Sequence, residues 1–517
     1  MKRYVPHYVV FLTSMGVMII ELVASRLISK YFGNNLFTWT GIIGIVLGGI
    51  SLGNFLGGRL ADRFRVRKII SPLLLVTSFL IFMILILDLL VYRITERSEL
   101  SLISRAMILR SLFLMLLFFF LPSTSMGTIS PVMAKYALEK STKIGNTVGS
   151  IYAASAIGSI VGTFLSGFLL IPLLGITTII FIVAGMVGLL AVLMGSFRIA
   201  GAGWIGILIL LYTLSGGKSF SQSIFPYSLK DVRIRYSTDT KYSHLEVRDT
   251  DYGFRIERNL VMDGLVHNRY DPDNPERLLY EYEQIFASLT DYLVEHVAGE
   301  NEFYTLTLGG GACLFPDYME RAYCSSHNDV VEIDPEVVRI ARDYFNVMES
   351  DRLNIITADA RNYVDFVLKE NRQYDVVFLD AFNSFSIPYH LTTSEFLQKA
   401  SGVIKPEGVL VANCVDIFSV GQFLNAFIQT LSSVFPYVYV YEEPGDNRSV
   451  RTTFIVLGSF SKLDIERFYD SVNRLIAKKM PEKKLEELRL RNGQFILTDN
   501  HAPVEQMIAP VYFEHIK

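Results

Sequence analysis

The segment YDVVFLDAFNSF, Tyr374 to Phe385, decides how the second half of this chain folds. The run from Asp375 to Leu379 is short, mostly apolar and rich in strand-forming residues, which predicts a buried strand. The strand ends at an acid, Asp380, and the chain then enters a loop. In an open α/β sheet, ligands bind at the carboxyl ends of the strands. We therefore expect Asp380 to lie at a ligand-binding site.

The flanking sequence predicts a parallel sheet around this strand. From Phe303 onward strand-like segments alternate with helical ones, which is typical of a parallel sheet covered by helices on both faces. Helices are expected near 335–346, 360–370 and 393–399. The expected strands are FYTLTLGGG, DVVEID, NIITAD, YDVVFLD and GVLVANC, followed by YVYVYEE and TTFIVLG. These seven strands predict a Rossmann-like, nucleoside-binding domain of the methyltransferase type over residues 299–517.

A small antiparallel β-domain is predicted before this Rossmann-like domain. The segments DVRIRYS, SHLEVRD and FRIERNLVMDG alternate polar and apolar residues, which favours strands with one buried face. A helix is expected over 275–296. We therefore predict a β-rich N-terminal part of the same domain over residues 218–298.

Four successive strands of the predicted parallel sheet end in residues suited to bind a nucleoside. Glycines allow a tight turn and a close approach of the backbone to a ligand. An acid about 20 residues after such glycines can accept hydrogen bonds from ribose hydroxyls. Each feature is weak alone, but together they predict a nucleoside site. In strand order the residues are Gly309, Gly310 and Gly311, then Glu332 and Asp334, then Asp359, then Asp380.

The first 217 residues have a different character and predict a multi-pass helical bundle in a membrane. Runs of about 20 apolar residues are long enough to cross a bilayer as helices. Crossings are predicted near 7–28, 38–58, 69–92, 106–122, 148–171 and 173–196, with a weaker one near 201–214. Small residues four apart on a helix predict close helix packing; here they are Gly44, Gly48, Gly49, Gly53, Gly57, Gly158 and Gly162.

Basic residues predict the orientation of this bundle in the cell membrane. The segment GGRLADRFRVRK, residues 57–68, is the most basic short loop, and Lys135, Lys140 and Lys143 mark the second loop after it. Both loops are expected to face the cytoplasm. Six or eight crossings then leave the C-terminal domain in the cytoplasm, whereas seven would export it. We expect a cytoplasmic domain, so either 201–214 does not span or the region Pro122–Pro131 adds a partial crossing.

The overall composition sets further limits on function. A net charge of −3 gives no sign of the basic face that nucleic-acid binding requires. The cysteines, Cys313, Cys324 and Cys414, are widely spaced and match neither a metal site nor a disulfide framework. No group of His, Cys or carboxylate residues has the spacing of metal ligands. We therefore expect reduced thiols and no metal.

Several motifs together resemble the spermidine synthase family of polyamine aminopropyltransferases, in its membrane-fused bacterial form. In the C-terminal half they are VMDGLV, LGGGACLFPDYM, VEIDPEVVRIARDYF, TADARNYV, YDVVFLDAF and TDNHAPVE, and in the N-terminal half ELVASRLISKYFG and LGGISLGNFLGGRLADR. The resemblance implies transfer of an aminopropyl group from decarboxylated S-adenosylmethionine to putrescine or a related amine, with release of methylthioadenosine. The donor is then a co-substrate and no tightly bound cofactor is implied. A homodimer through the synthase domain is also implied.

The nucleoside side of the predicted site follows the family pattern. The resemblance implies that Glu332 binds the ribose and that Asp359 and Ala360 lie beside the adenine, although the usual Asp-Gly of the family is Asp-Ala here. It also implies that Pro388 packs near the nucleoside. A glutamine that contacts the nucleoside in the family falls near Ser243. These positions favour binding of an adenosyl sulfonium compound.

The acceptor side departs from the family pattern. Asp380 matches the general base that removes a proton from the attacking amine, and we expect it to be ionised at neutral pH. Synthases read Gly-Gly-Asp-Gly after the first strand, whereas the last two positions here are Ala312 and Cys313. The second acid of the family's Asp-x-x-Asp is Asn383. Because removing one partner of a buried charge pair can cost about 2 to 5 kcal/mol, these changes predict weaker binding of a diamine.

Other residues are candidates to bind the amine in place of the missing acids. The family's Tyr-His-Glu falls on Tyr280 to Glu283 without a histidine, which makes Glu281 and Tyr282 candidates. His390, just after the catalytic loop, is a second kind of candidate because histidine titrates near neutral pH. The acids that could compensate are Glu281, Glu283, Asp263, Glu442, Glu443 and Asp446.

Two other functions stay open from the sequence alone. The change at Ala312 removes a group that would repel the carboxylate of intact S-adenosylmethionine, so a methyl or aminocarboxypropyl transferase acting on another amine is the first alternative. The second is a membrane transporter or sensor with a nucleoside-binding domain. It is motivated by Glu21, Arg26 and Asp88, because ionisable residues in apolar segments are functional candidates.

Overall fold

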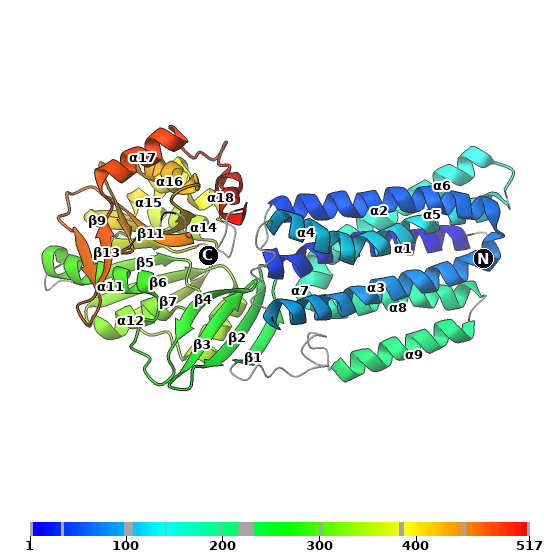
Figure 1. The fold of residues 1–517 in the computed structure, drawn as a ribbon, viewed down its shortest axis with the longest axis horizontal. Coiled ribbons are helices and arrows are strands. Elements are labelled where there is room, and N and C mark those ends of the chain that lie inside the picture. Colours follow the sequence, from blue (N-terminus) through cyan, green and yellow to red (C-terminus); the bar gives the residue numbers. More distant parts are fainter. Residues whose placement is uncertain are drawn as a thin grey trace. The chain divides into compact units, whose positions relative to one another are not determined.

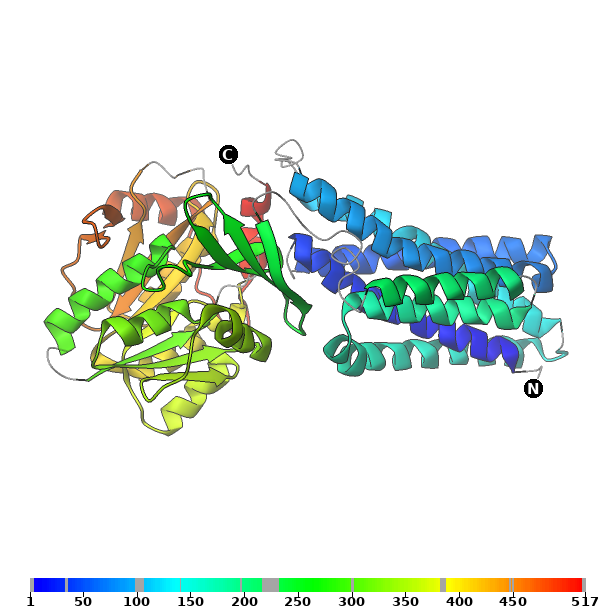
Figure 2. The same cartoon turned by 90° about the horizontal axis from the view of Figure 1, so that it is seen from below.

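A computed structural model describes residues 4–32, 36–97, 107–139, 141–195, 198–215, 232–298, 302–381, 387–445, 448 and 451–513. The chain divides into two units, Met1–Ser228 with Ser237–His244, and Leu229–Tyr236 with Leu245–Lys517. Figures 1 and 2 show a bundle of helices in the first unit and mixed helices and strands in the second. The predicted boundaries after residues 217 and 298 adjoin or fall within segments outside the described residues and stay predictions.

The first unit is built from long apolar helices. Its elements are α1 (Val5–Phe32), α2 (Leu36–Arg63), α3 (Val66–Arg97), α4 (Met107–Met115), η2 (Leu116–Phe120), α5 (Leu121–Leu138), α6 (Ile144–Leu165), η3 (Ser166–Leu170), α7 (Ile171–Leu173), α8 (Ile176–Met194) and α9 (Arg198–Ser215). Within the described part of the chain, six helical spans are long and apolar enough to cross a membrane. They are Val5–Ser29, Leu36–Arg63, Val66–Val91, Ser111–Leu138, Ile144–Leu170 and Ile176–Met194.

The fourth span differs from its prediction. The sequence placed a crossing at 106–122 and left open an extra one near Pro122–Pro131, whereas Ser111–Leu138 is one span. Pro122 stands at the start of α5, where a missing N–H costs nothing, and Pro131 is accommodated inside the helix. The proline-containing region is therefore the second half of the fourth span. The apolar segment Ile199–Thr213 in α9 is shorter than the six spans.

Glycine contacts explain which of the predicted small-residue faces are used. A Cβ added at Gly53 would lie 2.1 Å from the backbone oxygen of Thr124 in α5, and one at Gly158 would lie 2.2 Å from that of Phe11 in α1. The backbones of α2 and α5, and those of α1 and α6, therefore touch at these points. A Cβ at Gly44 or Gly48 would meet nothing within 4 Å, so these two glycines do not serve helix packing.

The second unit contains a four-stranded sheet in the order β1-β2-β3-β4. Its strands are β1 (Val232–Asp239), β2 (His244–Asp251), β3 (Ile256–Met262) and β4 (Leu265–Tyr270), and the pairs β2–β3 and β3–β4 are antiparallel. Three strands were predicted here. The fourth, β4, follows β3 after a turn at Asp263 and Gly264, both with positive φ, which is typical of a two-residue hairpin.

The same unit contains a nine-stranded sheet in the order β12-β13-β10-β11-β9-β8-β5-β6-β7. In this order, the strands β9, β8, β5, β6 and β7 pair in parallel with one another. The strands β12, β13, β10, β11 and β9 pair antiparallel. The strands are β5 (Phe303–Leu308), β6 (Ser326–Glu332), β7 (Leu353–Thr357), β8 (Tyr374–Leu379), β9 (Ile404–Ile417), β10 (Tyr437–Glu442), β11 (Arg451–Ser459), β12 (Arg467–Tyr469) and β13 (Leu475–Lys479). The predicted count of seven was wrong, because β12 and β13 form an edge hairpin without a long apolar run.

Helices cover both faces of this sheet (Figure 1). They are α11 (Glu281–Leu293), η4 (Val294–Ala298), α12 (Leu314–Ala322), α13 (Pro335–Phe345), α14 (Ala360–Lys369), η5 (Tyr389–Leu391), α15 (Ser394–Gly402), α16 (Phe423–Ser432), α17 (Glu482–Asn492) and α18 (Val504–Phe513). Phe286 of α11 and Phe315 of α12 pack on Phe378 of β8 in one apolar core. This packing fixes the start of α11 over the end of β8. The helix predicted from residue 275 begins six residues later, at Glu281.

Candidate active site

The site lies at the point where the order of strands along the chain reverses. The chain runs from β5 outward to β6 and β7, then returns to the other side of β5 for β8 and β9. A crevice at such a switch point is where doubly wound sheets bind ligands. Asp380 directly follows β8, and its backbone N–H donates to the Leu308 oxygen at the end of β5 at 2.9 Å. The predicted position of Asp380 at the carboxyl edge therefore agrees with the strand order.

The glycine turn after β5 packs closely against two neighbouring segments of the protein, and its predicted approach to a ligand stays a prediction. Gly309 has a φ of +97°, and a Cβ added there would lie 2.4 Å from the backbone oxygen of Asp380. Gly311 has a φ of +51°, and its added Cβ would lie 2.5 Å from Oδ1 of Asn268. Side chains are excluded at both positions by space and by backbone conformation.

Glu332 is the last residue of β6, and its carboxyl accepts hydrogen bonds from this turn. Its Oε2 accepts the backbone N–H groups of Gly310 at 3.2 Å and Gly311 at 2.9 Å, and its Oε1 accepts that of Asp334 at 3.0 Å. Burial raises the pKa of the Glu332 carboxyl, and these backbone hydrogen bonds act in the opposite direction. The carboxyl is thus held by the loop on which the resemblance places the ribose.

The two other strand-end acids cap helices. Asp334 is the N-cap of α13 and its Oδ1 accepts the Glu336 N–H at 3.0 Å, while Asp359 is the N-cap of α14 and its Oδ1 accepts the Asn362 N–H at 2.9 Å. Oδ2 of Asp359 lies 3.6 Å from Nε2 of His390. One oxygen of Asp359 is therefore structural, and the other faces the segment after the catalytic loop.

Asp380 is oriented by two side chains from other elements. Nδ2 of Asn413 in β9 donates to its Oδ1 at 3.0 Å, and the Tyr282 hydroxyl at the start of α11 hydrogen-bonds to the same carboxyl. Burial raises the pKa of Asp380 to about 7, and both hydrogen bonds act to lower it. The expectation that this acid is fully ionised at neutral pH was wrong. Its environment places it near the midpoint of its titration, where general bases work best.

Glu283 extends this group along the first turn of α11. It is 1% exposed, and its carboxyl receives hydrogen bonds from the Tyr280 backbone and the Asn268 side chain. Burial first, and then the charge of Asp380, raise its pKa to about 8. Oδ1 of Asn268 in turn accepts the Ala312 N–H at 2.8 Å. A chain of contacts thus leads from the glycine turn through Asn268 to the two acids.

The departures at Ala312 and Cys313 change the turn itself. Ala312 and Cys313 are both fully buried in an apolar cluster with Leu314 and residues of α13. Cys313 adopts the left-handed conformation, with a φ of +55°, where the family carries glycine. Burial raises the pKa of its thiol, so the thiol stays protonated. The assignment of Ala312 to substrate binding stays a prediction.

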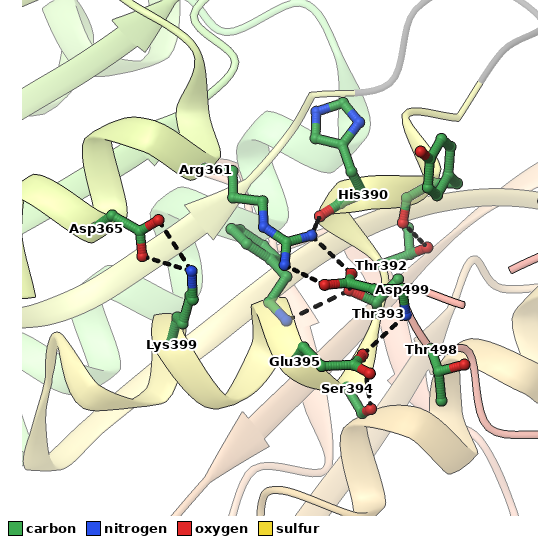
Figure 3. Close-up of polar contacts among 12 residues, drawn as sticks. Arg361, Asp365, His390, Thr392, Thr393, Ser394, Glu395, Lys399, Thr498 and Asp499 are labelled. Carbon is green, nitrogen blue, oxygen red and sulfur yellow. Dashed lines mark hydrogen bonds and ion pairs between the residues drawn. The ribbon is translucent and has the colours of Figure 1, made fainter. Parts of the chain in front are cut away.

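A second polar network joins α14, η5 and the start of α15 to the segment around Asp499 (Figure 3). Nη1 of Arg361 in α14 donates to the backbone oxygen of His390 at 3.0 Å and to Oδ1 of Asp499 at 2.7 Å. Asp499 also accepts the Thr393 hydroxyl at 2.7 Å and donates its N–H to Glu395 at 3.0 Å. This network ties the motif TDNHAPVE to the start of α15. Arg361 thus binds the backbone of His390, and a role of the His390 side chain in amine binding stays a prediction.

Other predicted residues lie apart from this group or outside the described residues. Ser243 lies in the turn between β1 and β2 and bonds to Thr240, and Pro388 precedes η5, so their contact with a nucleoside stays a prediction. Glu281 is exposed and lies 3.7 Å from Arg474. Ala360 begins α14 beside Asp359. Asn383 and Asp446 lie outside the described residues.

Two residues of the site were missed by reasoning from the sequence. Asn413 is a polar residue within the apolar run GVLVANC, and Leu379 pairs with Ala412, so the register of β8 and β9 places Asn413 level with Asp380. The signal available in the sequence was a polar residue inside an apolar run. Asn268 lies in β4, a strand that was not predicted, and its contact with Ala312 joins elements 44 positions apart. In the described part of the chain no group of three or more His, Cys, Asp or Glu residues is arranged to hold a metal ion.

This sheet order, the glycine turn and the strand-end acids define a Rossmann-like domain of the methyltransferase type. Residues 295–444 match the family described as the spermine/spermidine synthase domain, so the C-terminal part of the chain contains this domain.

Relatives with two activities are similar to this part of the chain. A polyamine aminopropyltransferase of Vibrio vulnificus is 39% identical over 140 residues, which cover 27% of this chain and 45% of that protein. The human eEF1A lysine and N-terminal methyltransferase is 29% identical over 150 residues, covering 27% of this chain and 21% of that protein. The chain thus spans less than half the length of either relative. The crystal structure of spermidine synthase from Thermotoga maritima has 18% identity and a TM-score of 0.37, covering 50% of this chain and 88% of that one.

Proposed function

We propose that this protein is a membrane-bound aminopropyltransferase that uses decarboxylated S-adenosylmethionine and a primary amine such as putrescine. The observation that carries the proposal is the environment of Asp380. This acid lies at the switch point of a synthase domain beside the glycine turn, is hydrogen-bonded by Asn413 and Tyr282, and has a pKa raised to about 7. A group that is half-ionised at neutral pH is suited to accept the proton of an attacking amine.

The donor side of the proposal rests on the glycine turn and the acids around it. Gly309 and Gly311 bring the turn against Asp380 and Asn268, and Glu332 accepts the backbone N–H of Gly311. We propose that Glu332 exchanges its backbone hydrogen bonds for the ribose hydroxyls and that Asp359 lies beside the adenine. Because the sulfonium is already a good leaving group, the protein supplies mainly orientation, which can provide about 7 to 11 kcal/mol.

The proposed reaction has a simple balance of bonds and charge. Asp380 accepts a proton from the acceptor ammonium, and the neutral nitrogen attacks the methylene carbon next to sulfur. The new C–N bond forms as the C–S bond breaks, and its electron pair goes to sulfur. Methylthioadenosine leaves as a neutral thioether, and the positive charge passes to the alkylated nitrogen. A positioned base contributes about 10²- to 10⁴-fold to such a step.

The test of this function is release of methylthioadenosine by the purified full-length protein. We expect product with decarboxylated S-adenosylmethionine and putrescine, and a loss of about 10²- to 10⁴-fold in kcat for Asp380→Asn. Asp343→Asn in α13 is the matched control, because that acid pairs with Arg339 on the helix surface. Absence of product with every amine of a diamine and monoamine panel contradicts the proposal.

A second candidate function is methyl or aminocarboxypropyl transfer from intact S-adenosylmethionine. The observation that favours it is Ala312, which leaves no carboxylate at a position that would repel the carboxylate of this donor. The similarity to the human methyltransferase points to the same class of donor. Calorimetric titration with both sulfonium compounds separates the candidates, because a clear preference for the decarboxylated compound excludes the second.

For the membrane unit we propose six crossings with the synthase domain in the cytoplasm. Six apolar spans and the basic segment between α2 and α3 support this orientation. Cys324 provides a natural reporter, because it is the exposed cysteine of the described residues whereas Cys313 and Cys414 are buried. We expect a membrane-impermeant thiol reagent to label Cys324 in inverted vesicles and not in intact cells, with Cys324→Ser as control. Labelling in intact cells contradicts this orientation and makes α9 a seventh crossing.

A further inference from the structure

Glu283 is a buried acid whose two carboxyl oxygens have different surroundings. The residue stands in the first turn of α11, and hydrogen bonds from the Tyr280 backbone and the Asn268 side chain reach its carboxyl. Its Oε2 is buried and has no hydrogen-bond partner among the described residues. A buried polar atom without a partner is costly, so it marks a place that a ligand or ordered water fills.

The unpartnered oxygen belongs to the acid beside the proposed base. The charge of Asp380 acts directly on Glu283, and Tyr282, the preceding residue of α11, hydrogen-bonds to Asp380. The first turn of α11 therefore places one group on the base and the next group beside it. Two neighbouring buried carboxyl groups repel each other when both are ionised, and a cation between them removes this penalty.

The arginine that attracts Glu283 is already bound to another acid. Arg269 in β4 attracts Glu283, but its guanidinium is bound to Glu257 by hydrogen bonds of 2.7 and 2.9 Å. The charge of Glu283 also acts on the phenols of Tyr280 and Tyr282, and burial raises the pKa of both, that of Tyr280 to about 12. Arg451 in β11 acts on Tyr280 and on His267. Near neutral pH the two carboxyl groups are thus the ones that titrate.

We propose that Glu283 and Asp380 together form the binding site for the ammonium group of the acceptor amine. This proposal rests on the proposed aminopropyl transfer and names the residue that replaces the acids absent at Ala312 and Asn383. An ammonium group has three N–H donors. One bonds to Oε2 of Glu283, one bonds to Asp380, and the alkyl chain points away from both acids. The ligand class is a primary alkylamine.

Glu283 has a defined task in the reaction. The proton that leaves the ammonium goes to Asp380, and the carboxylate of Glu283 stays ionised beside the nitrogen. When the C–N bond forms and the C–S bond breaks, positive charge returns to this nitrogen, where Glu283 stabilises it. Glu283 therefore interacts more strongly with the ammonium before proton transfer, and with the alkylated nitrogen after the C–N bond has formed, than with the neutral amine between these two states.

The test is Glu283→Gln in the full-length protein, because glutamine at this position keeps the capping hydrogen bonds of α11. We expect KM for putrescine to rise about 10- to 100-fold, the loss of one hydrogen bond to a charged group. The acid limb of log kcat/KM against pH should have a limiting slope of about 2 in the wild type, since two carboxyl groups must ionise, and about 1 in the variant. Glu295→Gln, an exposed acid in η4 after α11, is the matched control.

A binding measurement separates this proposal from the proposed function. If the wild type releases no methylthioadenosine, the function fails, and calorimetric titration of putrescine into both proteins still tests the site. Weaker putrescine binding by the variant, with unchanged binding of methylthioadenosine and an unchanged unfolding temperature, supports the site. Equal putrescine affinity in the two proteins overturns it, as does a wild type that binds no putrescine. Loss of methylthioadenosine binding together with a lowered unfolding temperature shows a structural role and also overturns it.

Discussion

Replacing Asn413 by alanine should raise the pKa of the proposed base and move the pH optimum upward. Nδ2 of Asn413 donates to Oδ1 of Asp380 at 3.0 Å, and this hydrogen bond favours the ionised form. A hydrogen bond to a charged group contributes about 1.5 to 3 kcal/mol, and one pKa unit corresponds to about 1.4 kcal/mol. Starting from a pKa of about 7, Asn413→Ala should therefore raise the pKa of Asp380 by about 1 to 2 units. At pH 7 the ionised fraction of Asp380 therefore falls from about one half by about 5- to 50-fold.

The assay is the pH dependence of methylthioadenosine release at low putrescine. Because Asp380 must be ionised to accept a proton, activity is lost as pH falls through its pKa, so the acid limb should shift toward higher pH in Asn413→Ala. At pH well above the limb, the two proteins should approach the same rate. Asn425→Ala is the matched control, since Asn425 is also buried and donates to the Gly493 oxygen at 3.0 Å in another part of the unit. An acid limb that stays in place in Asn413→Ala, or shifts equally in Asn425→Ala, refutes the reasoning.

Three other substitutions test other features. Gly309→Ala should abolish methylthioadenosine binding, measured by calorimetry, because its Cβ would lie 2.4 Å from the Asp380 oxygen at a φ of +97°, whereas Gly253→Ala, with a φ of +80° and open space around it, should retain binding. Burial raises the pKa of Asp416 to about 7, so the folded state holds a proton there that the unfolded state has lost, and stability falls as pH rises from about 4 to about 7. In Asp416→Asn, urea unfolding should show less of this fall, and an unchanged pH dependence would exclude Asp416 as its source. Gly53→Leu should lower the yield of folded protein in detergent because α2 and α5 touch there, while Gly48→Leu should not; equal losses would contradict the packing.

The parallel sheet was predictable because its signals are local. Buried strands such as β8 are continuous apolar runs, and Pro335 together with Asp334 marks the start of α13 within a few residues. The edge strands β12 and β13 were not predicted, because short, half-exposed strands contain no such apolar run. The fourth membrane span was misplaced because here a local signal was present and gave the wrong bound. Local proline rules favoured a break near Pro122, whereas the packing of α5 against α2 continues the helix.

The glycine turn and the strand-end acids of the candidate site were also predictable from the sequence, whereas the surroundings of Asp380 were not. Gly309, Gly311 and Glu332 act through backbone geometry and register, which their spacing encodes. The surroundings of Asp380 depend on side chains from α11 and β9, and their approach is set by the packing of Phe286 on Phe378. Sequence spacing contains no information on such contacts. The raised pKa of Asp380 was missed for the same reason, because it is a consequence of burial.

The pattern of departures from the family therefore has a physical explanation in the position of α11. The family places acids on the turn after β5 and in the loop after β8. Here position 312 lies inside an apolar cluster, where an ionised acid would be costly to bury. The start of α11 provides an acid, Glu283, and a phenol, Tyr282, on the same side of Asp380. If the acceptor amine binds at Glu283 as proposed, it requires neither of the lost acids, and the substitutions at 312 and 383 are compatible with amine transfer.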